Sequence, residues 1–472
     1  MRYNQRPAAL GFAVLTILVA GCAAQPHVLD ARHGTDADRA PSPDSEVLVG
    51  LAVSGGGSRA ATFTASVLEE LAKVKVAEGG RQRSFVEYVD TISSVSGGSL
   101  ATAYYGINKP GRSVPALQGD GLSEPYMKFF RQFRADMAKN YEESLLRSWY
   151  TDATRRAENL ADTWNGDLFH NATFLDLYER EQKGDSPKIV LNGTSWDDGR
   201  RFVMTNLPMS EFSFEFTSEV IKDLGNRPAA ADDVRELKKH AQDDFFRFRP
   251  ITFEEINADP RKLPVSVAVA ASSSVPLIIG PVMFQVQGSD RKHHIGDGGL
   301  FDNQGIESVA QIFFKKLGEP ARGAARKGLL VVIDASYPFK VDDEDLRKAK
   351  SALELLKTDP SRVSDIMEQR ARAYQLLLWA HLRGTRAVVP DRETLRIVYL
   401  RHTDVTEAIL DYIPKECASL VDNPPTLEKI KTLLNRIPTR FEIKECHALL
   451  LGAAARNVVE ANGAALGGFL GK

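Results

Sequence analysis

Three short segments combine small residues with groups that can carry out acyl transfer. The first is Ser54–Arg59, in which Gly55, Gly56 and Gly57 follow an apolar run and precede a helical pattern. Consecutive glycines at the start of a helix expose backbone N–H groups, and such groups bind anions. The segment lacks the Gly-Lys-Ser/Thr ending of a nucleotide-binding P-loop. We therefore expect a phosphate or an oxyanion at this loop, while a simple tight turn would explain the glycines equally well.

The second segment, Ser93–Leu100, ends an apolar run and again precedes a helical pattern. A nucleophile on a sharp strand-to-helix turn needs very small residues two positions before and two positions after it. Ser94 and Gly98 occupy these positions around Ser96, although glycine is more usual than serine at the first of them. The spacing therefore predicts that Ser96 is a nucleophile.

The third segment is Gly296–Gly299, which contains Asp297. A carboxylate between glycines is uncrowded, so neighbouring backbone can approach it closely. Taken alone, the segment is also typical of an acidic turn.

In this order, the three segments resemble the patatin-like phospholipase family. That family carries a Gly-rich oxyanion loop ending in Arg or Lys, then a Gly-x-Ser-x-Gly elbow and an Asp-Gly-Gly/Ala acid. Ala270–Pro276 also looks like the Ala-Ser-Ser stretch of the family, and Asn303 falls near its usual Asn-Asn-Pro. The resemblance covers about residues 46–335. It implies a Ser–Asp dyad of Ser96 and Asp297, with an oxyanion hole drawn from Gly55, Gly56, Gly57, Arg59 and Gly97.

This chemistry would proceed through an acyl-enzyme and would need neither a metal nor a cofactor. A carboxylate with an ordinary pKa near ~3.9 is a poor base for an alcohol, so we expect Asp297 to be buried. Arg59 would either hold the loop, neutralise a nearby acid, or lie exposed on the first helical turn. A Ser-His-Asp triad remains the alternative, and its candidate bases are His293, His294, His381, His402 and His447.

The elements around these segments alternate between strand and helix. Val47–Val53 and Val86–Val95 read as strands, and helical patterns follow them at Ala61–Val76 and from Ser99 onward. This order predicts an α/β fold with a mainly parallel central sheet that is flanked by helices. Further strands are expected at Lys188–Asn192, Arg201–Thr205, Val265–Ala271, Gly328–Asp334 and Thr394–Leu400, and helices at about 124–160, 345–383 and over the last fifty residues.

The N-terminus has the features of an export signal. Arg2 and Arg6 precede thirteen apolar residues, Ala8–Ala20, a stretch too short to cross a bilayer as a stable helix. The following Gly21-Cys22 resembles a bacterial lipobox, which implies lipidation of Cys22 and stable membrane anchoring. A simple secretory signal is the alternative. Residues 22–45 lack apolar periodicity, and we expect a disordered tether with a reach of ~25 Å.

The expected organisation is a signal peptide (1–21), the lipidated tether (22–45), a catalytic domain (46–335) and a mostly helical C-terminal region with one added strand (336–472). Cys417 and Cys446 are the other two cysteines. Export to an oxidising compartment favours a disulfide between them, and two free thiols are the alternative.

Composition limits the partners. The 472 residues are 43% hydrophobic and 26% charged, with 60 Lys+Arg against 62 Asp+Glu. This near-neutral balance, without a dense basic run, argues against a nucleic-acid partner. Protein partners are not indicated by the sequence.

Together these features predict a membrane-anchored lipid acyl hydrolase of the phospholipase A or lysophospholipase type, acting on phospholipid or lysophospholipid. The expected location is that of an exported bacterial lipoprotein at the outer membrane, on its periplasmic or surface face. Two alternatives stay open. One is a non-catalytic lipid-binding or scaffolding lipoprotein that keeps the fold, and the other is a hydrolase of soluble esters.

Overall fold

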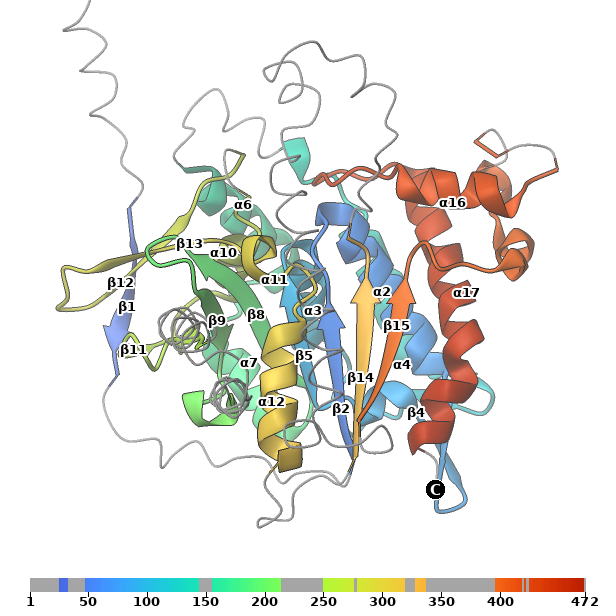
Figure 1. Ribbon diagram of the computed structural model, residues 1–472, viewed down its shortest axis with the longest axis horizontal. Helices are drawn as coiled ribbons and strands as arrows, with labels where there is room; N and C mark the ends of the chain where they lie inside the picture. The colour runs from blue at the N-terminus through green and yellow to red at the C-terminus, as the bar shows by residue number, and fades with distance from the viewer. Residues whose placement is uncertain are drawn as a thin grey trace, which may run out of the picture.

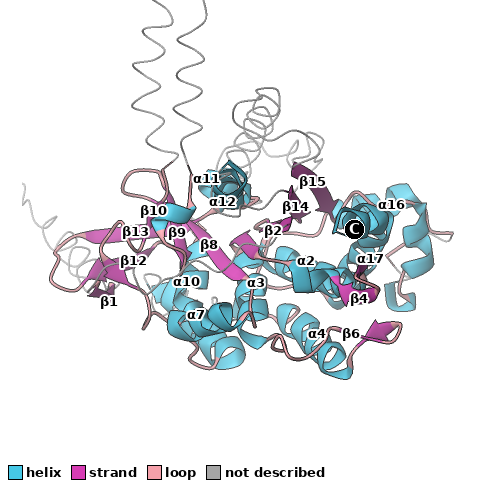
Figure 2. Cartoon of the chain, turned by 90° about the horizontal axis from the view of Figure 1, so that it is seen from below, coloured by secondary structure: helices cyan, strands magenta, loops and turns pink. Residues whose placement is uncertain are grey.

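The computed structural model of the chain describes residues 25–32, 47–143, 155–213, 249–275, 278–318, 327–336, 395–417, 420–421 and 424–470. These residues form a large central sheet with helices on both faces (Figures 1 and 2). The sheet is mixed but mostly parallel, so the predicted α/β class is confirmed. Its strands lie in the order β11-β1-β12-β13-β8-β5-β2-β14-β15, and β9 and β10 extend it from β8.

The strands of the main sheet are β1 (His27–Ala31), β2 (Val47–Val53), β5 (Thr91–Val95), β8 (Lys188–Ser195), β9 (Arg201–Thr205), β10 (Ile251–Thr252), β11 (Ala258–Asp259), β12 (Val282–Val286), β13 (Lys292–Asp297), β14 (Lys327–Asp334) and β15 (Leu395–Arg401). Two small hairpins pair β3 (Lys75–Glu78) with β4 (Arg81–Ser84) and β6 (Leu117–Gln118) with β7 (Gly121–Leu122). The parallel part runs from β8 through β5, β2 and β14 to β15.

The α-helices are α2 (Gly57–Lys73), α3 (Gly97–Asn108), α4 (Glu124–Met137), α6 (Arg156–Trp164), α7 (Phe174–Lys183), α10 (Val265–Ser272), α11 (Gly299–Asp302), α12 (Ile306–Gly318), α16 (Leu427–Asn435) and α17 (Glu445–Leu470). Short 3-10 or π turns occur at Phe85–Tyr88, Asn165–Phe169, Met209–Glu211, Glu407–Tyr412 and Lys415–Cys417.

Strand β2 is covered on both faces because successive side chains point to opposite sides of a sheet. Leu48 and Ala52 belong to the cluster that packs under α12, while Val49 and Leu51 belong to the larger cluster that includes α2. Gly50 faces α12 so closely that a Cβ at this position would lie 2.6 Å from a methyl group of Val309. β2 is therefore a deeply buried strand, and the Gly-rich segment follows directly from its C-terminal end.

Most predicted elements form near their expected bounds. β2 occupies the predicted residues, and β8 and β9 form the antiparallel hairpin expected around the Lys188–Asn192 and Arg201–Thr205 runs. The strand expected at Val86–Val95 is shorter, because its first residues form a 3-10 turn and β5 begins at Thr91. The helical pattern at 345–383 lies outside the described residues.

The strand expected at Val265–Ala271 is wrong: this run forms helix α10. All of its residues are buried, so the segment shows neither a two-residue nor a 3.6-residue period. A short apolar run of this kind is ambiguous between a buried strand and a buried helix, and packing decides it. Helix α10 packs between α6 and the sheet strands β8 and β13.

The disordered tether expected at 22–45 is also wrong in part, because His27–Ala31 forms strand β1. Residues of β1 pair in parallel with β12 and antiparallel with β11. Leu29 is buried, so a single apolar side chain anchors this strand although the segment has no apolar periodicity. Residues 33–46 lie outside the described part of the chain, as does the signal-like segment with Cys22.

The C-terminal region is joined to the same body. Its strand β15 pairs in register with β14 over the whole of its length, and α17 packs against α2 (Figure 1). Cys417 and Cys446 form a disulfide with their Cα atoms 5.4 Å apart. No helix in the described ranges has both the length and the apolar character required to cross a bilayer.

Candidate active site

Two helix N-termini meet at the C-terminal edge of the sheet. Neighbouring parallel strands β2 and β5 end at this edge, and α2 and α3 start directly beyond them. The approach is close enough that a Cβ at Gly97 would collide with the backbone of Gly57. A Cβ at Gly98 would similarly lie 2.5 Å from the carbonyl oxygen of Ser54. The glycines in the two motifs therefore bring these two helix starts together.

Ser96 occupies the turn between β5 and α3. Its backbone has φ 52° and ψ −126°, a conformation that is costly for a residue with a side chain. The side chain is 5% exposed. Its N–H donates to Oγ of Ser272 at 3.0 Å, so a side chain from α10 satisfies the group that the turn leaves without a helical partner.

Ser94 departs from the usual glycine without disturbing this turn. Its Oγ lies 2.6 Å from Oγ1 of Thr102 and accepts a hydrogen bond from Oγ of Ser99 at 3.2 Å. Both partners lie on α3, so the added hydroxyl ties the strand to the helix that follows the turn.

The Gly-rich loop presents backbone donors beside Ser96. Gly56 and Gly57 have φ values of 136° and 57°, which glycine adopts without a steric penalty. The N–H groups of Gly57 and Gly97 are the first of their helices, so they have no intrahelical acceptor. Gly55 differs from these residues, because its N–H donates to the carbonyl of Asn303 at 2.9 Å. Gly55 is thus a packing contact of Ser96 and not an available oxyanion donor.

Arg59 is 1% exposed, so the alternative of a surface arginine is wrong. Its Nε donates to the carbonyl of Ala335 at 2.7 Å, and its Nη2 donates to Oγ1 of Thr439 at 3.0 Å. Its Nη1 donates to the carbonyl of Ile437. The guanidinium therefore holds the loop to its surroundings, which was one of the roles expected from the sequence.

Asp297 ends β13 and is followed at once by α11. Its side chain is 5% exposed, and Oδ1 accepts a hydrogen bond from the N–H of Gly299 at 2.7 Å. A Cβ at Gly298 would collide with the carbonyl of Asn192, so only glycine allows β13 to turn this close to β8. The expected burial of Asp297 is confirmed.

The structure brings Ser96 and Asp297 together from positions two hundred residues apart. Burial raises the pKa of Asp297 to about 6, while the Gly299 N–H and the nearby Ser96 hydroxyl oppose this shift. Oδ2 of Asp297 is buried without a hydrogen-bond partner among the described residues, so it is available to take a proton. The carboxylate is thus a stronger base than an exposed aspartate, and the serine hydroxyl lies within its reach.

A shared set of hydrogen bonds supports both residues. Oγ of Ser272 accepts from the Ser96 N–H and donates to the carbonyl of Asn192 at 2.6 Å. The carbonyl of Ser274 accepts from the N–H of Asp297 at 3.0 Å. The residues at the C-terminal end of α10 therefore hold both Ser96 and Asp297 in position through hydrogen bonds from their backbone N–H groups.

Asn192 connects the same region to β5 and α12. Its Nδ2 donates to the carbonyl of Ser94 and to Oγ of Ser93, both at 2.9 Å, and its Oδ1 accepts from Oγ of Ser308. No sequence pattern pointed to Asn192, because an isolated asparagine in an apolar run has no motif that marks a role. The resemblance drew attention to the Ala270–Pro276 block that contains Ser272, but it gave no role for its hydroxyl.

None of the described histidines lies in hydrogen-bonding contact with Ser96, as the alternative Ser-His-Asp triad would require. His402 is buried at the end of β15, where its Nδ1 lies 3.3 Å from the carbonyl of Asp334, and burial lowers its pKa to about 4. His294 pairs with Asp197, and His293 precedes it on β13. His447 lies on α17, and His381 lies outside the described residues. In the part of the chain that the structure describes, none of them contacts Ser96 through a hydrogen bond, and no cluster of His, Cys, Asp and Glu side chains suited to a metal occurs.

The family model for patatin-like phospholipases matches residues 51–310, which is more than half of the chain. The chain therefore belongs to this family. The matched residues contain the Gly-rich loop, Ser96 and Asp297, and they end within α12.

Solved structures with a related fold include human GIVD cytosolic phospholipase A2, with a TM-score of 0.45 and 13% identity over 90% of this chain and 60% of that chain. The same human protein in complex with methyl gamma-linolenyl fluorophosphonate gives a TM-score of 0.44. VipD from Legionella pneumophila gives a TM-score of 0.29 with 12% identity, over 95% of this chain and 72% of that chain. The chain thus spans 60% of the length of the human protein. A comparison with curated proteins found no match.

Proposed function

We propose that this protein is a lipid acyl hydrolase of the phospholipase A or lysophospholipase type that works with a Ser96–Asp297 dyad. The observation that carries the proposal is the buried Asp297 carboxylate, with its pKa raised to about 6, beside the hydroxyl of a serine on a strained strand-to-helix turn. Membership of the patatin-like phospholipase family supports a lipid ester as the substrate class.

In the proposed reaction, Oγ of Ser96 attacks the ester carbonyl while Asp297 accepts the hydroxyl proton. The carbonyl oxygen becomes an oxyanion, and the N–H groups of Gly56, Gly57 and Gly97 stabilise it. Collapse of the tetrahedral intermediate breaks the ester bond, and Asp297 returns the proton to the departing alcohol. Water then attacks the acyl-enzyme with Asp297 again as the base, which releases the fatty acid. Removing one oxyanion donor typically costs ~10²- to 10³-fold in rate.

We further propose that the protein is a lipoprotein anchored through Cys22, at the bacterial outer membrane. Because β1 begins at His27, at most about 17 Å of extended chain would separate the lipidated residue from the sheet. The folded body would consequently lie close to the lipid surface, which suits an enzyme whose substrate is part of that surface.

A fluorophosphonate probe tests the catalytic proposal, because it modifies an activated serine without requiring the natural substrate. We expect labelling of the wild-type protein and loss of labelling in Ser96→Ala and Asp297→Asn. Products from a phospholipid with two different acyl chains, identified by mass spectrometry, would then show which ester bond is cut. A folded wild-type protein that neither labels nor hydrolyses lipid would instead support the non-catalytic lipid-binding alternative.

A further inference from the structure

A C-terminal segment, Ile437–Phe441, lies directly against the Gly-rich loop. The carbonyl of Arg440 accepts a hydrogen bond from the N–H of Ser58 at 2.7 Å. A Cβ at Gly57 would collide with the same Arg440 carbonyl, so the two backbones are in close contact. The segment therefore touches the loop at Gly57, whose N–H is a proposed oxyanion donor, and at the next residue, Ser58.

Arg59 extends this contact with its side chain. Its Nη1 and Nη2 donate to the Ile437 carbonyl and to Oγ1 of Thr439, while its Nε donates to the carbonyl of Ala335 at the end of β14. The guanidinium also borders the loop, since a Cβ at Gly56 would lie 2.9 Å from its Nη2. One buried side chain thus joins the loop, the sheet and the C-terminal segment.

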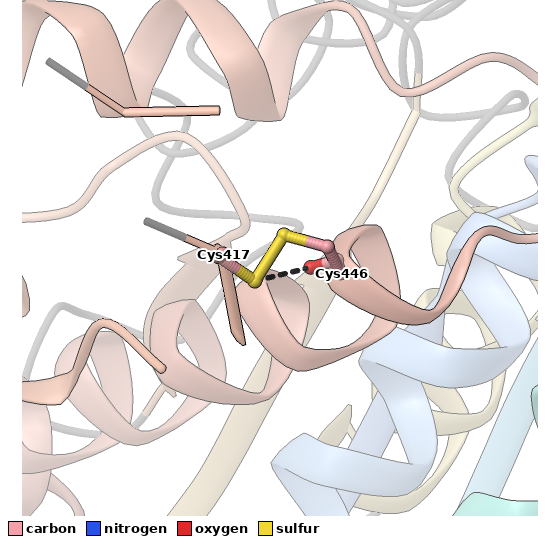
Figure 3. Close-up of a disulfide and its surroundings, with 2 residues drawn as sticks. All are labelled: Cys417 and Cys446. Atoms are coloured by element: carbon pink, nitrogen blue, oxygen red, sulfur yellow. Dashed lines mark hydrogen bonds between the residues drawn. A yellow bond between two sulfur atoms is a disulfide. The ribbon is translucent and has the colours of Figure 1, made fainter. Parts of the chain in front are cut away.

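The segment is itself fixed on both sides. The ring of Phe441 packs against Trp164 with the ring centroids 6.0 Å apart, and the carbonyl of Phe441 accepts from the N–H of Tyr141 at 2.8 Å. The disulfide between Cys417 and Cys446 closes the part of the chain that contains the segment (Figure 3). Packing against Trp164, the hydrogen bond to Tyr141 and the disulfide around it therefore restrict the movement of the segment.

From these contacts we propose that Ile437–Phe441 is a positioning segment for the oxyanion loop, so that the C-terminal region completes the catalytic site. The proposal rests on the proposed function, and it goes beyond the family match, which ends at residue 310. Arg59 and Thr439 act as positioning residues, because neither touches the reacting atoms. Misplacement of catalytic groups by about 1 Å can cost ~10²-fold in rate, so a small shift of the loop is sufficient to impair turnover.

The first experiment is a double-mutant cycle on Arg59 and Thr439. Arg59→Lys keeps the charge but cannot reach all three acceptors, and Thr439→Val keeps the shape but removes one acceptor. We expect each change to lower kcat by about 10-fold or more with little change in KM, and the double variant to be less impaired than the product of the two effects. Thr426→Val is the matched control: this threonine lies within the same disulfide-closed part of the chain, and its hydroxyl caps α16 by accepting from the Lys429 N–H. It should lower stability slightly and leave kcat unchanged.

The second experiment measures hydrogen exchange at the Ser58 amide, which reports the contact with Arg440 directly. In Cys417→Ser/Cys446→Ser, and in the wild-type protein reduced with dithiothreitol, we expect faster exchange at this amide together with a lower kcat. Unchanged exchange and unchanged kcat in folded protein, in both this variant and Arg59→Lys, would overturn the proposal. If the wild-type protein neither hydrolyses esters nor labels with a fluorophosphonate, the proposed function fails, while the exchange measurement still decides whether the segment holds the loop.

Discussion

At the level of single residues, the proposed chemistry depends on how a carboxylate is made basic without a histidine. Asp297 lies at the end of a buried strand, and loss of solvent raises its pKa to about 6. The same burial destabilises its ionised form in the folded protein. Catalytic competence and stability are therefore opposed at this residue.

The pH dependence of the reaction follows from this pKa. Asp297 accepts a proton only when it is ionised, so we expect kcat/KM on a soluble ester to be constant above pH ~7 and to fall about tenfold per unit below pH ~6. A titration of initial rates between pH 4.5 and 8 measures this. Replacing His293, His294, His381, His402 and His447 singly should leave the inflection in place, and its disappearance in any one of them would favour the triad.

Removal of the carboxylate should also change stability in a pH-dependent way. Because the pKa of Asp297 is higher in the folded than in the unfolded chain, its stabilising contribution is full below pH ~4 and is lost as the pH rises through about 6. We expect Asp297→Asn to raise the free energy of unfolding by ~1–3 kcal/mol at pH 8 and to leave it nearly unchanged at pH 4. Urea unfolding at the two pH values measures the difference, and a variant that is less stable at pH 8 would contradict the argument.

Ser272 offers a prediction about positioning. Ser272→Ala removes the acceptor of the Ser96 N–H, so a buried donor loses its partner and the strained turn loses a constraint. We expect kcat to fall at least 10-fold while KM changes little. The neighbouring Ser273→Ala is the matched control, because its hydroxyl is buried without a hydrogen-bond partner among the described residues. Equal rates in the two variants would exclude a role for the Ser272 hydroxyl.

At the level of secondary-structure elements, an ion pair holds α12, the helix that follows Asp297 and α11 in the chain. Arg201 on β9 is 1% exposed, and its guanidinium pairs with Glu307 on α12 at 2.9 Å. Its Nη2 also donates to Oε1 of Gln311 at 2.9 Å. This pair holds α12 against β9, and α12 is joined to Asp297 through the short helix α11.

Breaking this pair on one side should be costly, because it leaves a mostly buried carboxylate without its partner. We expect Arg201→Leu to lower the free energy of unfolding by ~2–4 kcal/mol, and Arg201→Leu/Glu307→Leu to recover part of the loss. Chemical denaturation of the wild type, Arg201→Leu, Glu307→Leu and the double variant measures the coupling. A double variant that is as unstable as the sum of the two single changes would show that the pair contributes no coupling.

At the scale of the whole molecule, the sheet joins both ends of the chain to the catalytic body. The N-terminal strand β1 forms part of one side of the sheet, and β15 with α17 covers the other (Figure 1). The short connection between Cys22 and β1 leaves little freedom for an anchored protein to move away from the lipid.

Membrane attachment provides the prediction at this scale. We expect the wild-type protein expressed in bacteria to sediment with membranes, and Cys22→Ser to be recovered in the soluble fraction with unchanged activity on a soluble ester. Fractionation followed by metabolic labelling with a fatty acid analogue measures both. Retention of Cys22→Ser in the membrane fraction would contradict anchoring through this residue.

The sharp turns and the order of strands and helices could be predicted from the amino-acid sequence alone. The glycines around Ser96 and Asp297 indicate sharp turns because only small residues fit there, and the alternation of apolar runs with helical patterns predicts the parallel sheet. The glycine spacing and the apolar periodicity each involve residues close together in the chain. They can therefore be recognised without knowing how the chain folds.

Features that depend on partners distant in the sequence were settled by the folded arrangement of the chain. The apolar run at Val265–Ser272 forms a helix because its neighbours bury it on every side. His27–Ala31 forms a strand because its backbone pairs with β11 on one side and β12 on the other. Asn192 and Ser272 acquired their roles from hydrogen bonds to residues far along the chain, and Arg59 from contacts with Ile437 and Thr439. Hydrogen bonds and burial of this kind form between segments that folding brings together, and no local pattern encodes which segments will meet.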